Sequence, residues 1–193
     1  MVRVAVFVSG GGTNLQAILD AQGSVIRNAE VALVVASRED AYALERAKKH
    51  GVPGVVLRDE ADIQRTLEEN GIGLIVLAGY MRILSSAFTA RWDKRILNVH
   101  PSLIPSFCGK GMYGLHVHEA ALAYGVKVTG ATVHFVNEIP DGGQIILQKA
   151  VYVEEGDTPE VLQQRVMQQA EWIILPQATE MISAQIKAAK ENE

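Results

Sequence analysis

An amide and an imidazole stand one residue apart near the middle of the chain. Asn98 and His100 follow the apolar pair Ile96 and Leu97, and positions two apart in an extended strand face the same way. Both side chains should therefore enter one space at a strand end. The carboxylate of Asp141, further along the chain, could hold the imidazole. Such a trio can stabilise an oxyanion and move a proton, and it needs no nucleophile if the substrate supplies an amine.

Each member of this trio also has an ordinary structural interpretation. A lone histidine is more often structural than catalytic, although Pro101 biases His100 toward an extended conformation. Asp141 stands before two glycines and suits a plain turn. In an open α/β sheet, however, ligands bind beyond the carboxyl ends of the strands, where Asn98 and His100 are expected. That placement favours a site.

A glycine-rich turn is expected between the first strand and the first helix, over residues 9–14. Backbone N–H groups at a helix start attract phosphate, and glycines allow close approach. No Lys follows in the P-loop pattern, and Leu15 stands where a dinucleotide fingerprint has its third glycine. A monophosphate therefore fits better than ATP or NAD. Thr13 and Asn14 are candidate helix caps, and a tight turn without ligand is the alternative.

Several other titratable residues have two interpretations each. His134 falls in the middle of a predicted strand and is either a half-buried structural histidine or part of a site. His116 and His118 are a weak metal signal without a third ligand, and we expect no metal. Glu171 and Gln168 share one face of the predicted C-terminal helix, for which a solvated face is the ordinary interpretation.

Composition restricts the class of protein. The 193 residues are 48% hydrophobic and 21% charged, which allows a sizeable core. A net charge of −4 argues against general nucleic-acid binding. Cys108 is the only cysteine, so no intrachain disulfide is expected and a cytoplasmic location fits. We expect no signal peptide and no membrane span, because no apolar run approaches about 18 residues.

Short apolar runs alternate with helix-like stretches in the first half of the chain. They predict strands over 4–8, 31–36, 55–57 and 74–78, and helices over 15–19, 41–50 and 61–70. This alternation is typical of parallel βαβ units. We predict an α/β fold with an open, doubly wound, mostly parallel sheet and helices on both faces.

The pattern changes in the second half. A helix is predicted over 117–124, and long strands over 129–136 and 144–153 should add antiparallel pairing at one sheet edge. Pro159 suits the first position of a long C-terminal helix, and Pro176 should kink or interrupt that helix. No linker or repeat divides the chain, so we predict a single domain over 1–193.

Four motifs occur in order along nearly the whole chain. They are Ser9 to Gln16, Leu77 to Leu84, Asn98 to Pro105, and Thr132 to Val136 followed by Asp141-Gly142-Gly143. Together they resemble the phosphoribosylglycinamide formyltransferase family of purine synthesis. The resemblance implies transfer of a formyl group from the co-substrate 10-formyltetrahydrofolate to the glycyl amine of glycinamide ribonucleotide. It also implies a Rossmann-like phosphate-binding half at about 1–100 and a folate-binding, catalytic half at about 101–193.

The resemblance assigns roles residue by residue. The catalytic residues would be Asn98, His100 and Asp141. The substrate-binding residues would be Gly12, Thr13, Asn14, Gln168 and Glu171. The folate-binding residues would be Met81, Arg82, Ile83, Leu84, Asn98, Asn137, Glu138, Ile139, Pro140 and Asp141. His134 and Arg58 are further candidates, Arg58 for the folate tail. The partners would be small molecules, with no nucleic acid or membrane, and the protein would be a monomer or a weak homodimer.

One segment departs from the shorter family members. Residues 106–115 are longer than expected and contain Gly109, Gly111 and Gly114. We expect a mobile loop that lies over the substrate with Lys110 near its anion. A surface loop without a role is the alternative.

Three rival functions would require other sequence features. A hydrolase that releases formate from the same folate would have an extra N-terminal domain and a second histidine in place of Pro101. A transformylase for initiator methionyl-tRNA would have a further C-terminal domain and a more basic surface. Since Met1 leads directly into a predicted strand, we expect no such N-terminal domain, and with a net charge of −4 we expect neither the further C-terminal domain nor the basic surface. A non-catalytic phosphosugar-binding module would leave Asn98, His100 and Asp141 without a role.

Overall fold

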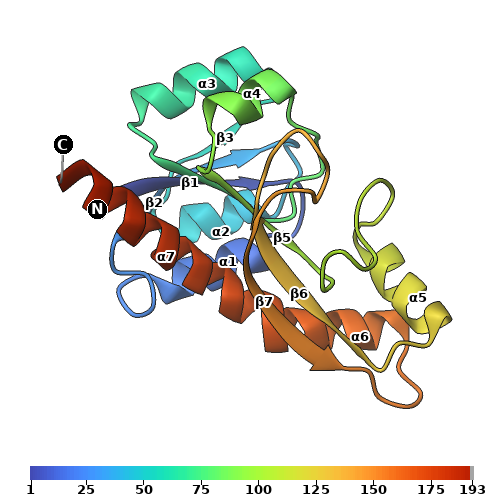
Figure 1. Ribbon diagram of the computed structural model, residues 1–193. Helices are drawn as coiled ribbons and strands as arrows, with labels where there is room; N and C mark the ends of the chain where they lie inside the picture. The colour runs from blue at the N-terminus through green and yellow to red at the C-terminus, as the bar shows by residue number, and fades with distance from the viewer. Residues whose placement is uncertain (192–193) are drawn as a thin grey trace.

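The computed structural model describes residues 1–191 and contains one seven-stranded sheet with the order β3-β2-β1-β4-β5-β6-β7 (Figure 1). The strands are β1 (Val2–Val8), β2 (Ala29–Ala36), β3 (Gly54–Val56), β4 (Leu74–Leu77), β5 (Ile96–His100), β6 (Val128–Phe135) and β7 (Ile145–Tyr152). The pairs among β1 to β5 are parallel, and β6 and β7 are antiparallel at one edge. The predicted fold class is confirmed.

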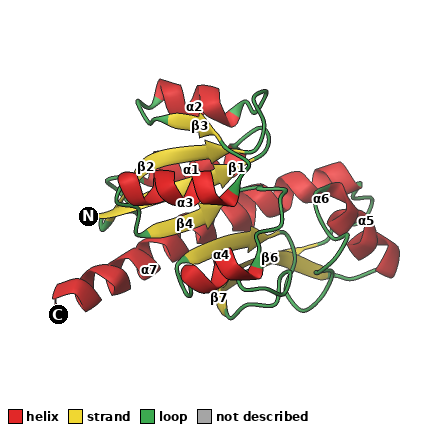
Figure 2. Cartoon of the chain, turned by 90° about the horizontal axis from the view of Figure 1, so that it is seen from above, coloured by secondary structure: helices red, strands yellow, loops and turns green. Residues whose placement is uncertain are grey.

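Helices cover both faces of the sheet (Figures 1 and 2). They are α1 (Thr13–Ala21), α2 (Ala43–Lys49), α3 (Glu60–Glu69), α4 (Ser86–Arg91), α5 (Leu115–Tyr124), α6 (Pro159–Val166), the π-helical segment η1 (Met167–Glu171) and α7 (Trp172–Glu191). α1, α2, α6 and α7 share a core with one face, and α3 and α4 with the other. In β1, Val4 and Val6 point to the first core and Phe7 to the second. A strand buried on both faces needs such an unbroken apolar run.

One local prediction is wrong at the start of α1, and one short helix was not predicted. Thr13 and Asn14 are not caps, because the cap position of α1 is Gly12 and both residues lie inside the helix. Helix α4 was not predicted, since its six residues are too few to show an apolar period. Ser85 begins α4 by accepting a hydrogen bond from the backbone N–H of Phe88 at 3.1 Å.

The C-terminal helical region begins as predicted and is interrupted elsewhere than predicted. The hydroxyl of Thr158 accepts from the N–H of Val161, and Pro159 takes the first helical turn. Pro176 lies inside α7, which continues past it. Pro176 has no N–H to donate to the carbonyl of Trp172, four residues earlier. Because Trp172 is the first residue of α7, only the first hydrogen bond of this helix is lost. The irregular segment is η1, just before Trp172.

None of the helices within residues 1–191 is long and apolar enough to cross a membrane.

Candidate active site

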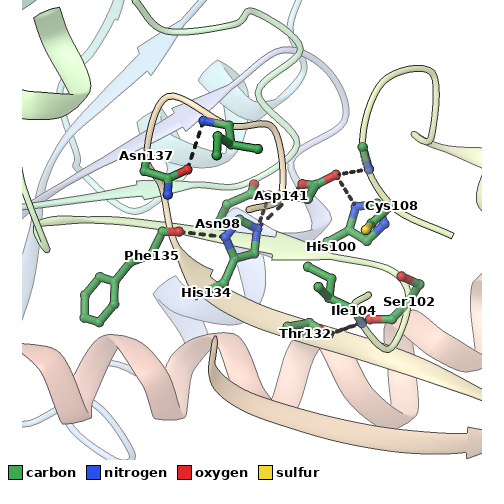
Figure 3. Close-up of polar contacts among 12 residues, drawn as sticks. Asn98, His100, Ser102, Ile104, Cys108, Thr132, His134, Phe135, Asn137 and Asp141 are labelled. Atoms are coloured by element: carbon green, nitrogen blue, oxygen red, sulfur yellow. Dashed lines mark hydrogen bonds and ion pairs between the residues drawn. The ribbon is translucent and has the colours of Figure 1, made fainter. Parts of the chain in front are cut away.

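Strand pairing brings the predicted trio together with a second histidine (Figure 3). In the register of β5 and β6, Asn98 pairs with His134, and His100 pairs with Thr132. Two histidines and an amide therefore lie side by side at the carboxyl end of β5. The turn after β6 brings Asp141 to them with a positive φ of 56°.

The carboxylate of Asp141 bridges the two imidazoles. Its Oδ2 lies 3.6 Å from Nδ1 of His100, and its Oδ1 lies 3.6 Å from Nε2 of His134. The backbone N–H of Gly109 donates to Oδ2 at 2.9 Å. Burial alone would raise the pKa of Asp141, but its contacts with His134, Gly109 and His100 outweigh burial and hold that pKa below its ordinary value. Asp141 is therefore an anion that faces both histidines.

His100 has an acceptor at each ring nitrogen. Its Nε2 lies 2.8 Å from the carbonyl oxygen of Phe107, and a carbonyl only accepts, so Nε2 carries a hydrogen. Its Nδ1 faces Asp141. A ring with acceptors at both nitrogens suits the doubly protonated imidazolium, which is the form that can donate a proton.

His134 sets the orientation of Asn98. The Nδ1 of His134 donates to the carbonyl of Phe135 at 2.8 Å, which leaves Nε2 to face the site. Nδ2 of Asn98 lies 3.2 Å from this Nε2. His134 is buried and hydrogen-bonded, as the structural interpretation requires, and it also belongs to the cluster of site residues. The same Nε2 lies 3.6 Å from Oδ1 of Asp141, so it faces both Asn98 and the carboxylate.

A cavity of about 140 Å³ adjoins this cluster. Its lining includes most of the residues predicted to bind folate: Arg82, Ile83, Leu84, Asn98, Asn137, Glu138, Ile139, Pro140 and Asp141, together with Leu77, Tyr80, His134 and Val136. Ile83 is 85% exposed and Ile139 is 58% exposed, so apolar side chains stand uncovered at its rim. That lining suits a flat, largely apolar ligand with a few polar edges.

Met81 lies outside that lining and belongs to a neighbouring hollow of about 350 Å³. Arg38, Arg58 and Arg82 line this second hollow, together with Ser9 and Ser37. The hollow is rich in positive charge, and Arg82 borders both spaces. The sequence indicated Arg58 as a candidate, but it gave no signal that Arg38 would join it.

The glycine-rich turn leads from β1 to α1. Gly12 has a φ of 73°, and a Cβ at this position would lie 2.6 Å from Cβ of Ala43. Its glycine is thus required by backbone conformation and by the packing of α1 on α2. Gly10 and Gly11 face open space, and Nε of Arg46 donates to the carbonyl of Gly11 at 2.8 Å. Gly10 and Gly11 therefore leave one side of the turn open.

Glu171 is not on a solvated helix face. It lies in η1, is 6% exposed, and accepts a hydrogen bond from Nδ2 of Asn14 at 2.8 Å. Burial raises its pKa to about 7, with the Asn14 hydrogen bond opposing that rise. The π turn carries Glu171 inward, whereas Gln168 is exposed. The π turn could not be predicted, because a propensity pattern does not show one inserted residue.

The segment over 106–115 contacts the trio through its backbone. The carbonyl of Phe107 and the N–H of Gly109 reach His100 and Asp141, and residue types give no signal for such contacts. Lys110 is exposed. His116 pairs with Glu119 on the surface, and His118 is buried. Within residues 1–191, no three His, Cys, Asp or Glu side chains are grouped to hold a metal ion.

Comparisons with known proteins show the family to which the chain is similar. A family model described as formyl transferase matches residues 2–179. A phosphoribosylglycinamide formyltransferase from Haemophilus influenzae is 41% identical over 185 residues, which cover 91% of this chain and 84% of the relative. The human trifunctional purine biosynthetic protein adenosine-3 is 43% identical over 98% of this chain. The chain spans only about a fifth, 19%, of that protein's length.

Solved structures are similar over almost the whole chain. The glycinamide ribonucleotide transformylase 1 from Symbiobacterium toebii has a TM-score of 0.87 and 42% identity, covering 96% of this chain and 89% of that one. The phosphoribosylglycinamide formyltransferase from Anaplasma phagocytophilum has a TM-score of 0.88 and 35% identity, with coverages of 95% and 87%.

Proposed function

The chain belongs to the formyl transferase family, and from this membership we propose that it transfers the formyl group of 10-formyltetrahydrofolate to the glycyl amine of glycinamide ribonucleotide. One observation carries the proposal. His100 and His134 face the anionic Asp141 and Asn98 contacts His134, beside a cavity lined by most of the predicted folate-binding residues.

Asn98 acts on the first step of the reaction. The amine nitrogen of the ribonucleotide bonds to the formyl carbon, and the carbonyl electron pair moves to oxygen. The Asn98 amide, oriented by His134, donates to this oxyanion. Loss of such a donor typically costs about 2.7–4 kcal/mol in the transition state.

His100 and Asp141 act on the second step. Collapse of the tetrahedral intermediate breaks the bond from the formyl carbon to N10 of tetrahydrofolate. The leaving nitrogen takes a proton from the His100 imidazolium, and the attacking amine loses one, either to the neutral imidazole of His100 that results or to water. Asp141 stabilises the imidazolium through its charge. Product formation therefore leaves the overall proton count unchanged.

The ribonucleotide would bind at the glycine-rich turn. Backbone N–H groups of Gly12, Thr13 and Asn14 at the start of α1 suit its phosphate. Glu171 would accept from a ribose hydroxyl, with Gln168 as a weaker contact. All these residues belong to one chain, which is consistent with a monomer or a weak homodimer as the active form.

The folate would bind in the two hollows beside the trio. The pterin suits the smaller cavity, where the segment over 82–84 and the turn over 137–141 contribute its walls. The acidic tail of the folate suits the neighbouring arginine-lined hollow, where Arg58 would pair with a carboxylate.

A direct assay tests the proposed function. The purified protein is mixed with both substrates, and formation of formylglycinamide ribonucleotide and tetrahydrofolate is followed. His100→Ala should lose about a hundredfold or more in kcat, while His116→Ala, which changes an exposed histidine, should keep wild-type rates. If the wild-type protein releases formate, or forms no product, the proposal is wrong.

The phosphate assignment has its own test at Gly11. Gly11→Val adds a side chain in open space at the turn, so it should raise the KM for the ribonucleotide and leave the KM for folate unchanged. Gly12→Val is unsuitable, because its side chain would collide with Ala43. An equal rise in KM for both substrates would argue against phosphate binding at the turn.

A further inference from the structure

Thr132 connects the proposed site to the edge of the sheet. It is fully buried on β6, where it pairs with His100 of β5 on one side and with Gln148 of β7 on the other. None of the proposed catalytic steps uses it. Its row across three strands nevertheless places it directly next to the proton-moving histidine.

The hydroxyl of Thr132 makes every hydrogen bond that a hydroxyl can make. It donates to the carbonyl of Ser102 at 2.6 Å and accepts from the N–H of Ile104 at 3.1 Å. It also accepts from Nε2 of Gln148 at 3.0 Å. One donor and two acceptor positions are thereby filled. A buried hydroxyl with three partners fixes the segment that it contacts.

The same segment has further attachments. Nε2 of Gln148 donates to the carbonyl of Ile104 at 3.0 Å, and the hydroxyl of Ser102 donates to the carbonyl of Ser106 at 2.6 Å. Gly130 of β6 leaves room for Leu103, because a Cβ there would lie 2.9 Å from a methyl carbon of Leu103. Residues 102–106 are therefore fastened to β6 and β7.

This fastened segment leads directly into the two backbone groups that contact the catalytic residues. Phe107 follows Ser106, and its carbonyl accepts from Nε2 of His100 at 2.8 Å. Gly109 donates its N–H to Asp141 at 2.9 Å. A shift at Ser106 would displace both groups, since Phe107 is the next residue and only two residues separate Gly109 from Ser106. A displacement of about 1 Å at a catalytic group can cost about a hundredfold in rate.

We propose that Thr132, supported by Gln148, is a positioning residue that holds residues 102–106 so that Phe107 and Gly109 meet His100 and Asp141. The proposal rests on the proposed function for its kinetic consequence. Thr132 is fully buried and cannot touch the substrate, so it would act only through the residues that it holds in place.

Three variants separate positioning from stability. Thr132→Val keeps the shape of the side chain and removes all three hydrogen bonds, whereas Thr132→Ser keeps the hydroxyl. Thr129→Val is the matched control, since Thr129 is buried on β6 and pairs with Val151. We expect Thr132→Val to lower kcat by about tenfold or more with less change in either KM. Thr132→Ser should restore most of that loss, and Thr129→Val should leave kcat unchanged.

Gln148→Leu tests whether the two residues act together. Gln148→Leu and Thr132→Val combined should lower kcat no further than Thr132→Val alone, because both changes release the same segment. Additive losses would overturn the joint role of Gln148. A Thr132→Val enzyme with wild-type kcat, whatever its stability, would overturn the whole proposal.

A spectroscopic measurement keeps the test independent of the assay. The ring nitrogens of His100 can be followed by ¹⁵N NMR of labelled protein without substrate. Thr132→Val should change the His100 signals, and Thr129→Val should not. If the wild-type protein transfers no formyl group but these signals change as expected, the proposed function fails and the positioning role stands. Unchanged signals together with unchanged kcat contradict the positioning role alone.

Discussion

Asp141 is the residue on which the site's electrostatics depend, because it is the one carboxylate that the described residues place between His100 and His134. Its left-handed backbone conformation, φ 56°, is uncommon for a residue with a side chain. Strain of this kind is tolerated where surrounding contacts determine it, here the N–H of Gly109. Turn propensity explains the neighbouring glycines, whereas only the fold explains why the carboxylate is turned inward.

Asp141→Asn should separate charge from shape. The amide oxygen can still accept from Gly109, but the neutral side chain no longer stabilises an imidazolium. We expect kcat to fall by about a hundredfold while the melting temperature changes little. Steady-state kinetics and thermal denaturation of the purified variant measure both. Wild-type turnover would show that His100 needs no anionic partner.

His118 predicts how the protein responds to acid. It is 0% exposed, and neither ring nitrogen has a hydrogen-bond partner among the described residues. Burial, with a smaller effect from His100, lowers its pKa from 6.5 to about 4. The unfolded chain therefore binds a proton at a higher pH than the folded one, and stability is lost as pH falls from about 6.5 to 4. The loss from this residue amounts to about 3 kcal/mol.

His118→Leu should remove this acid sensitivity. Its free energy of unfolding should exceed that of the wild type, and the excess should grow between pH 7 and pH 4.5. Urea denaturation at the two pH values measures it. His116→Leu is the control, because His116 is exposed and should leave the pH dependence unchanged. If the free energy of unfolding changes with pH equally in both variants and the wild type, the acid sensitivity does not come from His118.

At the scale of elements, apolar runs predicted six of the seven strands to within two residues at each end, and for β5 the pair Ile96 and Leu97 predicted its presence without bounds. Buried parallel strands such as β1 and β4 need continuous apolar residues, so the pattern states their location directly. Helix α4 and the π segment η1 were not predicted, because neither has an apolar pattern of its own. Their formation depends on contacts with distant residues, such as the hydrogen bond from Asn14 to Glu171, and no local period records them.

The candidate site likewise has one part that the sequence could predict and another part that it could not. Asn98 and His100 could be predicted to act together because a strand spacing of two fixes their common side. Their meeting with His134 depends on the register of β5 and β6, which the sequence does not state. The contacts of Phe107 and Gly109 with the trio are made by backbone atoms, so residue identity could not reveal them.

The η1 segment should make Glu171 costly to stability and useful to binding. Burial raises the pKa of Glu171 from 4.5 to about 7, so the folded state binds a proton more tightly than the unfolded chain. Stability from this residue is present below about pH 4.5 and is lost as pH rises through about 7, by about 3 kcal/mol in all. Ionised Glu171 at higher pH is then ready to accept from a ribose hydroxyl.

Glu171→Gln should reveal both effects. The amide stays neutral and can still accept from Asn14, so at pH 8 the variant should unfold at higher urea concentration than the wild type. At pH 5 the two should be nearly equal. The KM for glycinamide ribonucleotide should rise severalfold, while that for folate should not. Lower stability at pH 8 would show that the carboxylate is better solvated than its burial indicates.

At the scale of the whole molecule, the two halves of the chain share one core. The cluster on the α7 side runs from Val2 to Ile186 and includes residues of both halves. The carboxylate of Glu180 in α7 accepts from the backbone N–H groups of Arg27 and Asn28 at 2.8 and 2.9 Å. We therefore propose that the described chain folds as a single domain, and that residues 1–100 lack a complete core alone. Residues 192–193 of the predicted domain lie outside the described residues.

The two tryptophans can test this unity. Trp92 lies in the first half at the end of α4, buried in the second core cluster, and its Nε1 donates to Gln64 of α3 at 2.7 Å. Trp172 begins α7 in the second half and borders a hollow beside α1. Trp92→Phe and Trp172→Phe each leave one tryptophan, so fluorescence reports one half at a time. If the domain unfolds as one unit, both variants should show single transitions that coincide with loss of circular dichroism.

Fluorescence that changes at a lower urea concentration than circular dichroism, in either variant, would mean that the half containing the remaining tryptophan unfolds separately. The shared core and the contacts of Glu180 predict the opposite, because α7 cannot leave the sheet without exposing the apolar face of α1.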